Sequence, residues 1–155
     1  MAAWTVPMRE FAKKAGLSLD VVARKIMFDM FSNVIRLSPV DTGRFRANWN
    51  VGYGVIDDNT HTTTNVYRVD AQLRQLMAKD SVTRTVVYFT NSLPYALPLE
   101  YGMYPNPPKF GSKKKGEDGV AIHVTGGYSM QAPRGMVRIT VAATAEYIRK
   151  AVAGT

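Results

Sequence analysis

The longest hydrophobic pattern in the chain is helical and spans residues 19–37. Ser18 is a suitable N-cap, and Asp20 places a negative charge in the first turn, where the helix dipole favours it. Pro39 disfavours α geometry at Ser38, so the helix is predicted to end there. The apolar residues recur every three or four positions, as on one face of a helix: Leu19, Val22, Ile26, Met30, Val34 and Leu37.

A second apolar set lies on another side of the same helix and comprises Phe28, Phe31 and Ile35. A single sheet can cover only one side of a helix, so these residues need a separate explanation. Either the helix is wedged inside one core, or the three residues form an interface with another subunit. The pattern leaves both explanations open.

The next segment, residues 38–49, reads SPVDTGRFRANW. Asp at a turn can accept hydrogen bonds from backbone N–H groups just ahead of it, and Gly can take a positive φ. Asp41, Thr42 and Gly43 are therefore predicted to form a turn that Asp41 caps. Apolar and polar residues then alternate over 44–55, which predicts a strand with one face on a core.

The middle of the chain predicts three further elements. A weak apolar stripe indicates a helix at 69–79, and a segment dense in Val, Thr, Tyr and Phe indicates a central strand at 81–90. Residues 91–102 read as a short, irregular helical turn. Pro98 removes a backbone donor there, and Gly102 suits the left-handed position after the turn.

The C-terminal third begins with a loop, 103–119, rich in Pro, Gly and Lys. Residues 120–125 alternate and predict an extra strand that returns from this loop. The last element is predicted to be a helix over 133–152, although 136–141 also alternates, because Pro133 and an Ala-rich tail favour a helix. Its expected apolar face comprises Val137, Val141, Ile148 and Val152.

Composition narrows the range of functions. A chain of 155 residues predicts a single domain, 1–155. There is no cysteine, which excludes disulfides and thiolate metal sites. His61 and His123 lie far apart in the sequence, so a zinc site is not expected, although carboxylates alone could hold a harder metal. No cofactor is expected.

The N-terminus contains charge and has no apolar core suited to a signal peptide. No apolar run approaches the roughly 20 residues of a membrane helix. We therefore expect no membrane association and a cytoplasm-like compartment.

The formal net charge is +8. Basic proteins favour polyanions, of which nucleic acid is the usual one, through backbone charge rather than base identity. The basic residues are spread along the chain, and the one run is Lys113-Lys114-Lys115. Together with Lys109 it predicts a loop that faces DNA or a protein partner.

One motif could carry a reaction. Asp41-Thr42-Gly43 matches the catalytic triplet of aspartic proteases, in which two carboxylates share a proton, and a homodimer could assemble such a pair. Arg44 and Arg46 follow at once and would favour two ionised carboxylates instead. Such activity would appear as peptide cleavage near acidic pH that is lost in Asp41→Asn. The alternative is a turn with no catalytic role.

Three stretches taken together resemble a known family. SPVDTGRFRANW, YFTNSLPYALPLEYG and SMQAPRGMVRITV follow the helix VVARKIMFDMFSNVI in this order. They resemble the tail-completion (minor tail component, neck) proteins of long-tailed bacteriophages, the lambda Z-like group. The resemblance covers 8–56, 84–102 and 129–150.

The resemblance implies an α+β fold: a small antiparallel sheet packed by a long N-terminal helix and a C-terminal helix. It implies a virion protein without catalytic activity, made in the host cytoplasm. Such proteins form rings, usually hexameric, around the DNA channel. Their partners are the head connector or adaptor and the tail terminator or tail tube.

The chain departs from the family pattern at 103–128, where about 26 residues are inserted. A long polar loop with a strand could reach across to a neighbour's sheet edge. We predict that the loop 109–119 becomes ordered only in the assembly. Equal hydrogen-exchange protection there in monomer and ring would contradict this.

Overall fold

The structure is a computed structural model, and it describes residues 10, 13, 18–104 and 124–153. In chain order the named elements are α2 (Leu19–Leu37), α3 (Arg44–Ala47), β1 (Asn50–Tyr53), α4 (Tyr67–Met77), β2 (Val87–Thr90), α5 (Ala96–Tyr101), β3 (Val124–Thr125), β4 (Tyr128–Ser129), α6 (Val137–Ala142) and α7 (Thr144–Ala153).

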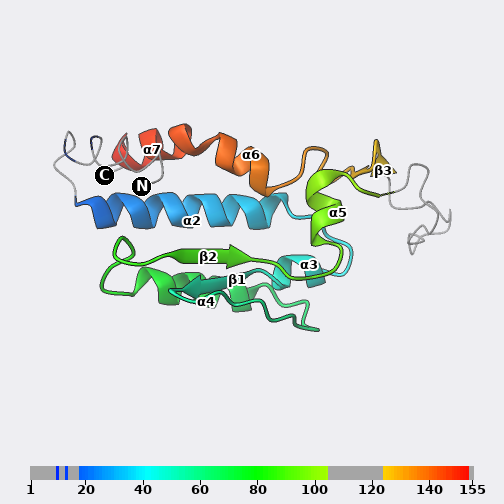
Figure 1. The fold of residues 1–155 in the computed structure, drawn as a ribbon, viewed down its shortest axis with the longest axis horizontal. Helices are drawn as coiled ribbons and strands as arrows, with labels where there is room; N and C mark the ends of the chain where they lie inside the picture. Colours follow the sequence, from blue (N-terminus) through cyan, green and yellow to red (C-terminus); the bar gives the residue numbers. More distant parts are fainter. Residues whose placement is uncertain (1–9, 11–12, 14–17, 105–123, 154–155) are drawn as a thin grey trace.

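The fold is α+β, as the resemblance implied. The long helix α2 lies between two layers (Figure 1): α6 and α7 cover one side, and the antiparallel pair β1–β2 lies on the other, with α4 beside it. A second, very short antiparallel pair, β3–β4, lies near α5. None of the described helices is both long enough and apolar enough to cross a membrane.

The prediction for α2 is confirmed at both ends. The Ser18 hydroxyl accepts the Val21 N–H at 3.2 Å, which caps the first turn. The helix ends at Ser38, which is extended, with φ −65° and ψ 131°, as expected for a residue before proline.

The predicted strand at 44–55 is wrong in its first half. Residues 44–47 form the helical turn α3, and β1 begins only at Asn50. The Asn48 side chain donates to the Arg44 carbonyl at 2.7 Å and closes this turn. Phe45 and Ala47 are buried as the alternation suggested, but Asn48 is fully buried as well. Tertiary contacts, rather than the alternation of buried and exposed residues, therefore determine the backbone conformation of residues 44–47.

The helix predicted at 69–79 is present as α4, and the strand predicted at 81–90 shrinks to β2. Residues 81–83 are drawn away from the sheet because their hydroxyl and amide groups bond to Asp20. The strands pair in register, with Val51 opposite Phe89. The Phe89 ring stacks on Phe31 at a centroid distance of 4.3 Å and on Trp49 at 4.7 Å. This three-ring stack joins α2 to the sheet.

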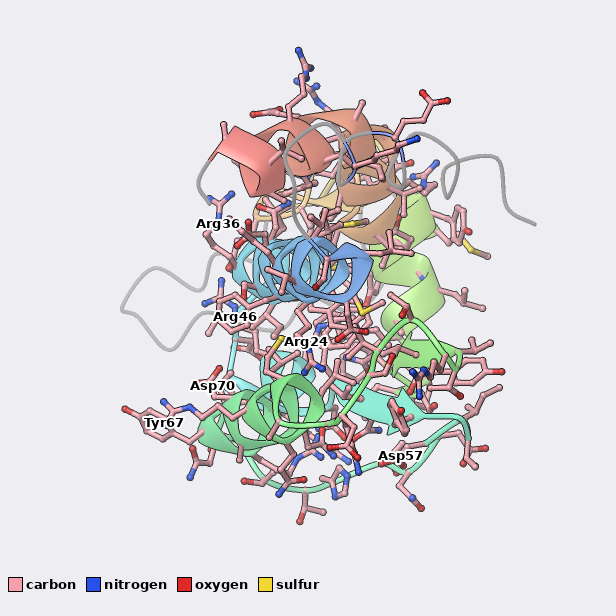
Figure 2. The ribbon with its side chains drawn as sticks, turned by 90° about the vertical axis from the view of Figure 1, so that its left-hand side faces the viewer. Arg24, Arg36, Arg46, Asp57, Tyr67 and Asp70 are labelled. Carbon is pink, nitrogen blue, oxygen red and sulfur yellow. The ribbon has the colours of Figure 1, made fainter. Side chains whose placement is uncertain are left out.

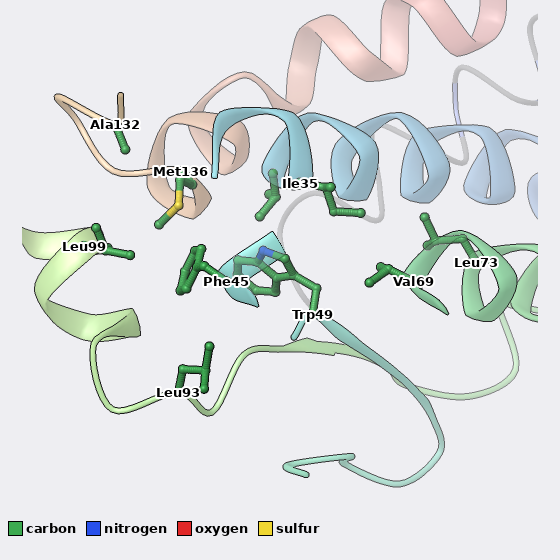
Figure 3. Close-up of a cluster of buried hydrophobic side chains, with 10 residues drawn as sticks. Ile35, Phe45, Trp49, Val69, Leu73, Leu93, Leu99, Ala132 and Met136 are labelled. Atoms are coloured by element: carbon green, nitrogen blue, oxygen red, sulfur yellow. The ribbon is translucent and has the colours of Figure 1, made fainter. Parts of the chain in front are cut away.

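The core around Trp49 draws its buried side chains from α2, α3, α4, α5 and the segments before α5 and α6 (Figure 3). Phe45 meets Trp49 edge-on and Tyr95 at a tilt, with ring centroids 5.9 and 5.8 Å apart. The other buried members of this cluster are Val34, Ile35, Val69, Leu73, Leu93, Leu99, Ala132 and Met136.

Residues 91–102 form the short turn that was predicted, and the helix in it, α5, tolerates Pro98. Pro98 is the third helical residue, where the backbone N–H has no partner within the helix in any case. Gly102 ends the helix in the left-handed conformation, with φ +66°.

The C-terminal helix is two helices, not one over 133–152. Gly135 has a φ of +79° and Met136 is not helical, so α6 starts at Val137. The predicted apolar face is also wrong in part, because Val141 is 56% exposed. Thr140 is buried instead, since its hydroxyl accepts a hydrogen bond from Asn33 at 2.9 Å and donates to the Met136 carbonyl at 2.8 Å.

Of the strand predicted at 120–125, β3 accounts for Val124 and Thr125. The remaining part, together with the loop prediction for 109–119, lies outside the described residues.

Candidate functional site

The three stretches that carry the resemblance meet at the C-terminal end of α2 (Figure 1). We call this region the junction and define it as residues 38–49, 91–102 and 129–138. The Gln131 amide pairs with both backbone groups of Val40, donating to its carbonyl at 2.9 Å and accepting its N–H at 2.8 Å. The Gln131 side chain bonds to Val40 as the backbone of a paired strand would, and this fixes the 129–138 segment to the turn after α2.

Glu100 is the central polar group of the junction and is buried. Its carboxylate accepts the backbone N–H groups of Met136 and Val137 at 2.7 and 2.9 Å, and that of Arg138 at 2.8 Å. These donors stand at the N-terminus of α6, where a negative charge also suits the helix dipole. Gly135 permits the contact, because a Cβ there would lie 2.5 Å from the Glu100 carbonyl oxygen.

Arg138 closes this arrangement from the solvent side. Its guanidinium donates to the Glu100 carbonyl at 2.7 Å and to the Tyr128 hydroxyl at 3.0 Å. It also lies over the Tyr101 ring, 4.7 Å from the centroid. The hydroxyl of Tyr128 and the carboxylate of Glu100 raise the pKa of Arg138, which therefore stays charged.

An open groove lies beside the junction, with a volume of about 510 Å³. The floor is mostly apolar. The lining residues are Tyr128, Pro133, Arg134, Arg138, Ile139 and Ala142.

Two more hydrogen bonds stabilise the junction, one within the first stretch and one between the first and second stretches. Trp49 Nε1 donates to the Ser38 hydroxyl at 2.9 Å, and Ser38 is itself buried. The Asn91 side chain donates to the Phe45 carbonyl at 2.9 Å. The polar residues of the three stretches thus bond mainly to one another.

The turn Asp41-Thr42-Gly43 is built differently from the prediction. Asp41 is exposed, and none of the described N–H groups donates to its carboxylate. The Thr42 hydroxyl accepts the Arg44 N–H at 3.3 Å instead, and Gly43 has a φ of +90°. Asp41 lies between two helices and not at the end of a strand, and no cluster of three His, Asp or Glu side chains suited to a metal occurs among the described residues.

The three residues considered for a subunit interface separate in the structure. Ile35 is buried in the core around Trp49, and Phe31 stacks on Phe89. Their packing agrees with a helix wedged inside one core, and the subunit interface stays a prediction. Phe28 is 44% exposed.

The predicted DNA-facing lysines, Lys109, Lys113, Lys114 and Lys115, lie outside the described residues. Arginines provide another basic surface near α3. Arg46 donates to the carbonyls of Ser38 and Arg36, both at 2.8 Å, and Arg68 donates to Ala47 and Trp49. Burial lowers the pKa of Arg68, and the charge of Asp57 partly offsets this.

These arginines are fixed by neutral carbonyl groups. In the part of the chain that the structure describes, Arg36, Arg44, Arg46 and Arg68 form no ion pair with a carboxylate. Figure 2 shows Arg36 and Arg46 on one side of the molecule together with Tyr67, which is 75% exposed, and Asp70. This side therefore carries two guanidinium groups, a carboxylate and an exposed aromatic ring.

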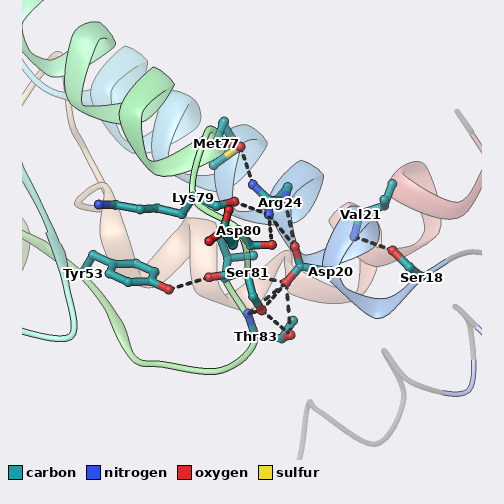
Figure 4. Close-up of polar contacts among 11 residues, drawn as sticks. Ser18, Asp20, Val21, Arg24, Tyr53, Met77, Lys79, Asp80, Ser81 and Thr83 are labelled. Atoms are coloured by element: carbon teal, nitrogen blue, oxygen red, sulfur yellow. Dashed lines mark hydrogen bonds and ion pairs between the residues drawn. The ribbon is translucent and has the colours of Figure 1, made fainter.

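A second polar cluster, which was not predicted, surrounds Asp20 (Figure 4). One carboxylate oxygen accepts hydrogen bonds from the Ser81 hydroxyl and the Val82 N–H, both at 2.8 Å. The same oxygen accepts from the backbone N–H and the hydroxyl of Thr83. The other accepts from Arg24. Partial burial raises the pKa of Asp20, but the bonds from Ser81, Val82, Arg24 and Thr83 outweigh it and hold the pKa far below its usual value.

A third cluster, also unforeseen, holds the loop after β1. The Asn48 amide bonds to both backbone groups of His61, and the Asn50 amide donates to the Asn59 carbonyl at 2.7 Å. Alternating Asn residues at 48 and 50 were visible in the sequence, but their fixed hydrogen bonds depend on a loop some ten residues away.

Comparison of the chain with models of protein families, with curated proteins and with solved structures finds no match.

Proposed function

We propose that this protein is a structural component of the neck of a long-tailed bacteriophage. In this role it completes the tail and joins it to the head connector as a ring, hexameric in the form the resemblance implies, around the DNA channel. Its partners are the connector or adaptor on one side and the tail terminator or tail tube on the other. It functions in the virion and is made in the host cytoplasm.

The observation that carries this proposal is the junction. The three stretches that resemble the tail-completion family are far apart in sequence, yet they form one hydrogen-bonded unit through Gln131 and Glu100. Their polar groups hold the backbone in place, Gln131 by its bonds to Val40 and Glu100 by its bonds to the N–H groups of 136–138. Such use of polar residues supports a role that depends on shape.

Labelling of intact particles tests the proposal. Virions produced by the genome that encodes this chain are incubated with gold-labelled antibodies against it and viewed by electron microscopy. Label at the head–tail joint is expected. Label along the tube or at the distal tip, or particles that lack the chain, would contradict a neck role.

A second candidate function is a DNA-binding module without sequence specificity. The arginines near α3 support it, because guanidinium groups without carboxylate partners can bind phosphates. The two candidate functions differ in how the affinity for DNA is expected to depend on salt. For a module, the affinity for short free duplexes falls steeply as salt rises. A ring component need not bind such duplexes at all.

A further inference from the structure

The outer edge of β2 carries backbone groups without a partner among the described residues. The Gly54 N–H donates to the Val86 carbonyl at 2.8 Å, and the register pairs Gly52 with Tyr88. In an antiparallel pair the residues that bond across alternate with residues that face outward. The N–H and C=O groups of Val87 and Phe89 therefore point away from β1.

The opposite edge of the sheet differs, because helix α4 bonds to part of it. The Val51 N–H, which faces outward from β1, donates to the Gln72 side chain of α4 at 3.3 Å. Arg68, also on α4, donates to the Trp49 carbonyl at 2.8 Å. Helix α4 thus bonds to two outward backbone groups on the β1 side, whereas none of the described residues bonds to the outward groups of Val87 and Phe89.

The sequence of β2 does not protect its edge. Residues 85–90 read TVVYFT, with no charge and no proline. Edge strands of monomeric proteins usually carry such features because an open edge pairs with other strands. Val86, directly before β2, is 58% exposed. A sheet of two strands is also marginal by itself and gains from a third.

We propose that the free edge of β2 binds an extended segment of a second copy of this chain, namely residues 120–125. This inference rests on the proposed assembly of identical subunits and names the surface used. An extended backbone can satisfy several groups of such an edge at once, because its own N–H and C=O groups repeat at the same spacing. Residues 120–125, VAIHVT, alternate as a strand does, and β3 at their end has β4 on one side only among the described strands.

The positions of β2 and β3 bear on the symmetry of the proposed contact between two copies of the chain. β2 lies beneath the middle of α2, whereas β3 lies beyond its C-terminal end (Figure 1). Two different surfaces meet in such a contact, and where it repeats from one subunit to the next it is head-to-tail. Head-to-tail contacts close into rings when the rotation permits.

Hydrogen exchange at single amides tests whether the edge is occupied. The Tyr88 and Thr90 amides bond to β1 and serve as internal controls that are protected at every protein concentration. The Val87 and Phe89 amides are expected to exchange fast in dilute protein and at least about tenfold more slowly in the assembled protein. Unchanged exchange at Val87 and Phe89 on assembly would overturn the proposal.

Engineered cysteines identify the occupant, because the natural chain has no cysteine. Chains with Val86→Cys are mixed with chains with Ile122→Cys under mild oxidation. A disulfide-linked pair of the two different chains is expected. Homodimers of Val86→Cys alone would show two β2 strands meeting, and a link within one chain of the double variant, with no link between chains, would show that the segment folds back; both results overturn the proposal.

Edge-blocking variants separate this inference from the proposed function. Val87→Pro removes an outward N–H and leaves the β1 ladder, and Val86→Lys adds a charge at the edge. Both are expected to reduce the mass measured by light scattering to that of a monomer, whereas Val55→Lys, at a site 73% exposed, is not. Unchanged folding is checked by circular dichroism. Assembly by the blocked variants, or wild-type protein that stays monomeric, overturns the edge contact but leaves the particle-labelling result standing.

Discussion

At the scale of single residues, the carboxylate of Glu100 joins α5 to α6. Glu100→Gln keeps the shape but removes the charge and one acceptor atom, so that an N–H of 136–138 loses its partner. We expect a loss of about 2 to 3 kcal/mol in the free energy of unfolding, measured with urea. Glu146→Gln is the matched control, since its pair with Lys150 is exposed to solvent and its loss is expected to change the stability little.

Asp20 gives the protein a predictable response to acid. Its pKa is lower in the folded chain than in the unfolded chain, so the unfolded state binds the proton first as pH falls. The stabilisation is complete above the unfolded value near 4 and is lost progressively below it. We expect the stability of Asp20→Asn to fall less steeply than that of the wild type between about pH 5 and 2. Parallel slopes in the two proteins would contradict this.

The turn after α2 depends on Gly43 more than on Asp41. A Cβ at residue 43 would lie 3.2 Å from the Thr64 carbonyl oxygen, and the φ of +90° is unfavourable for alanine. Gly43→Ala is expected to cost about 1 to 2 kcal/mol. Asp41→Asn, at an exposed carboxylate to which none of the described residues donates, is expected to change stability by less than about 0.5 kcal/mol. Thermal unfolding of both variants compares them directly.

At the scale of elements, the stack of Phe31, Phe89 and Trp49 holds the sheet against α2. Phe89→Ala removes the central ring and is expected to cost about 3 to 5 kcal/mol, within the usual range for a core phenylalanine. Val86→Ala, at the exposed position just before β2, is the control and is expected to cost less than about 0.5 kcal/mol. Similar losses in both would mean that the stack adds little.

Elements with a long, regular pattern were predictable, and those set by distant contacts were not. The spacing of apolar residues, Ser18 and Pro39 defined α2 to the residue. The turn at 44–47 was not predictable, since it depends on Arg46 reaching the end of α2 and on Asn48. The division between α6 and α7 was hidden for a similar reason, because a buried Thr140 interrupts the apolar face.

The candidate site shows the same division. The stretches that form the junction could be named from the sequence, but the roles of Gln131 and Glu100 within them could not, because each acts on backbone groups more than thirty residues away. From the sequence, Asp20 was predicted only to interact with the dipole of α2. In the structure its carboxylate also accepts hydrogen bonds from the loop before β2.

At the scale of the whole molecule, the unpaired arginines offer a test of DNA contact. Arg36→Gln removes one charge and a single bond to Asn33, so folding should change little. If this side meets DNA, duplex affinity falls and the slope of log affinity against log salt decreases by about 1. Arg149→Gln, on α7, is the matched control. Equal effects of the two variants would argue for a general charge effect.

The alternation of bonds along β2 links the edge to the core in a way that bears on the fidelity of assembly. A strand that slipped by one residue would turn Phe89 out of its stack and present the backbone of Tyr88 at the edge instead. The register of β2 therefore decides both which side chain packs in the aromatic stack and which backbone groups lie at the edge. A neighbour that binds Val87 and Phe89 would accept only subunits whose core has formed correctly, so that assembly itself acts as a proofreading step.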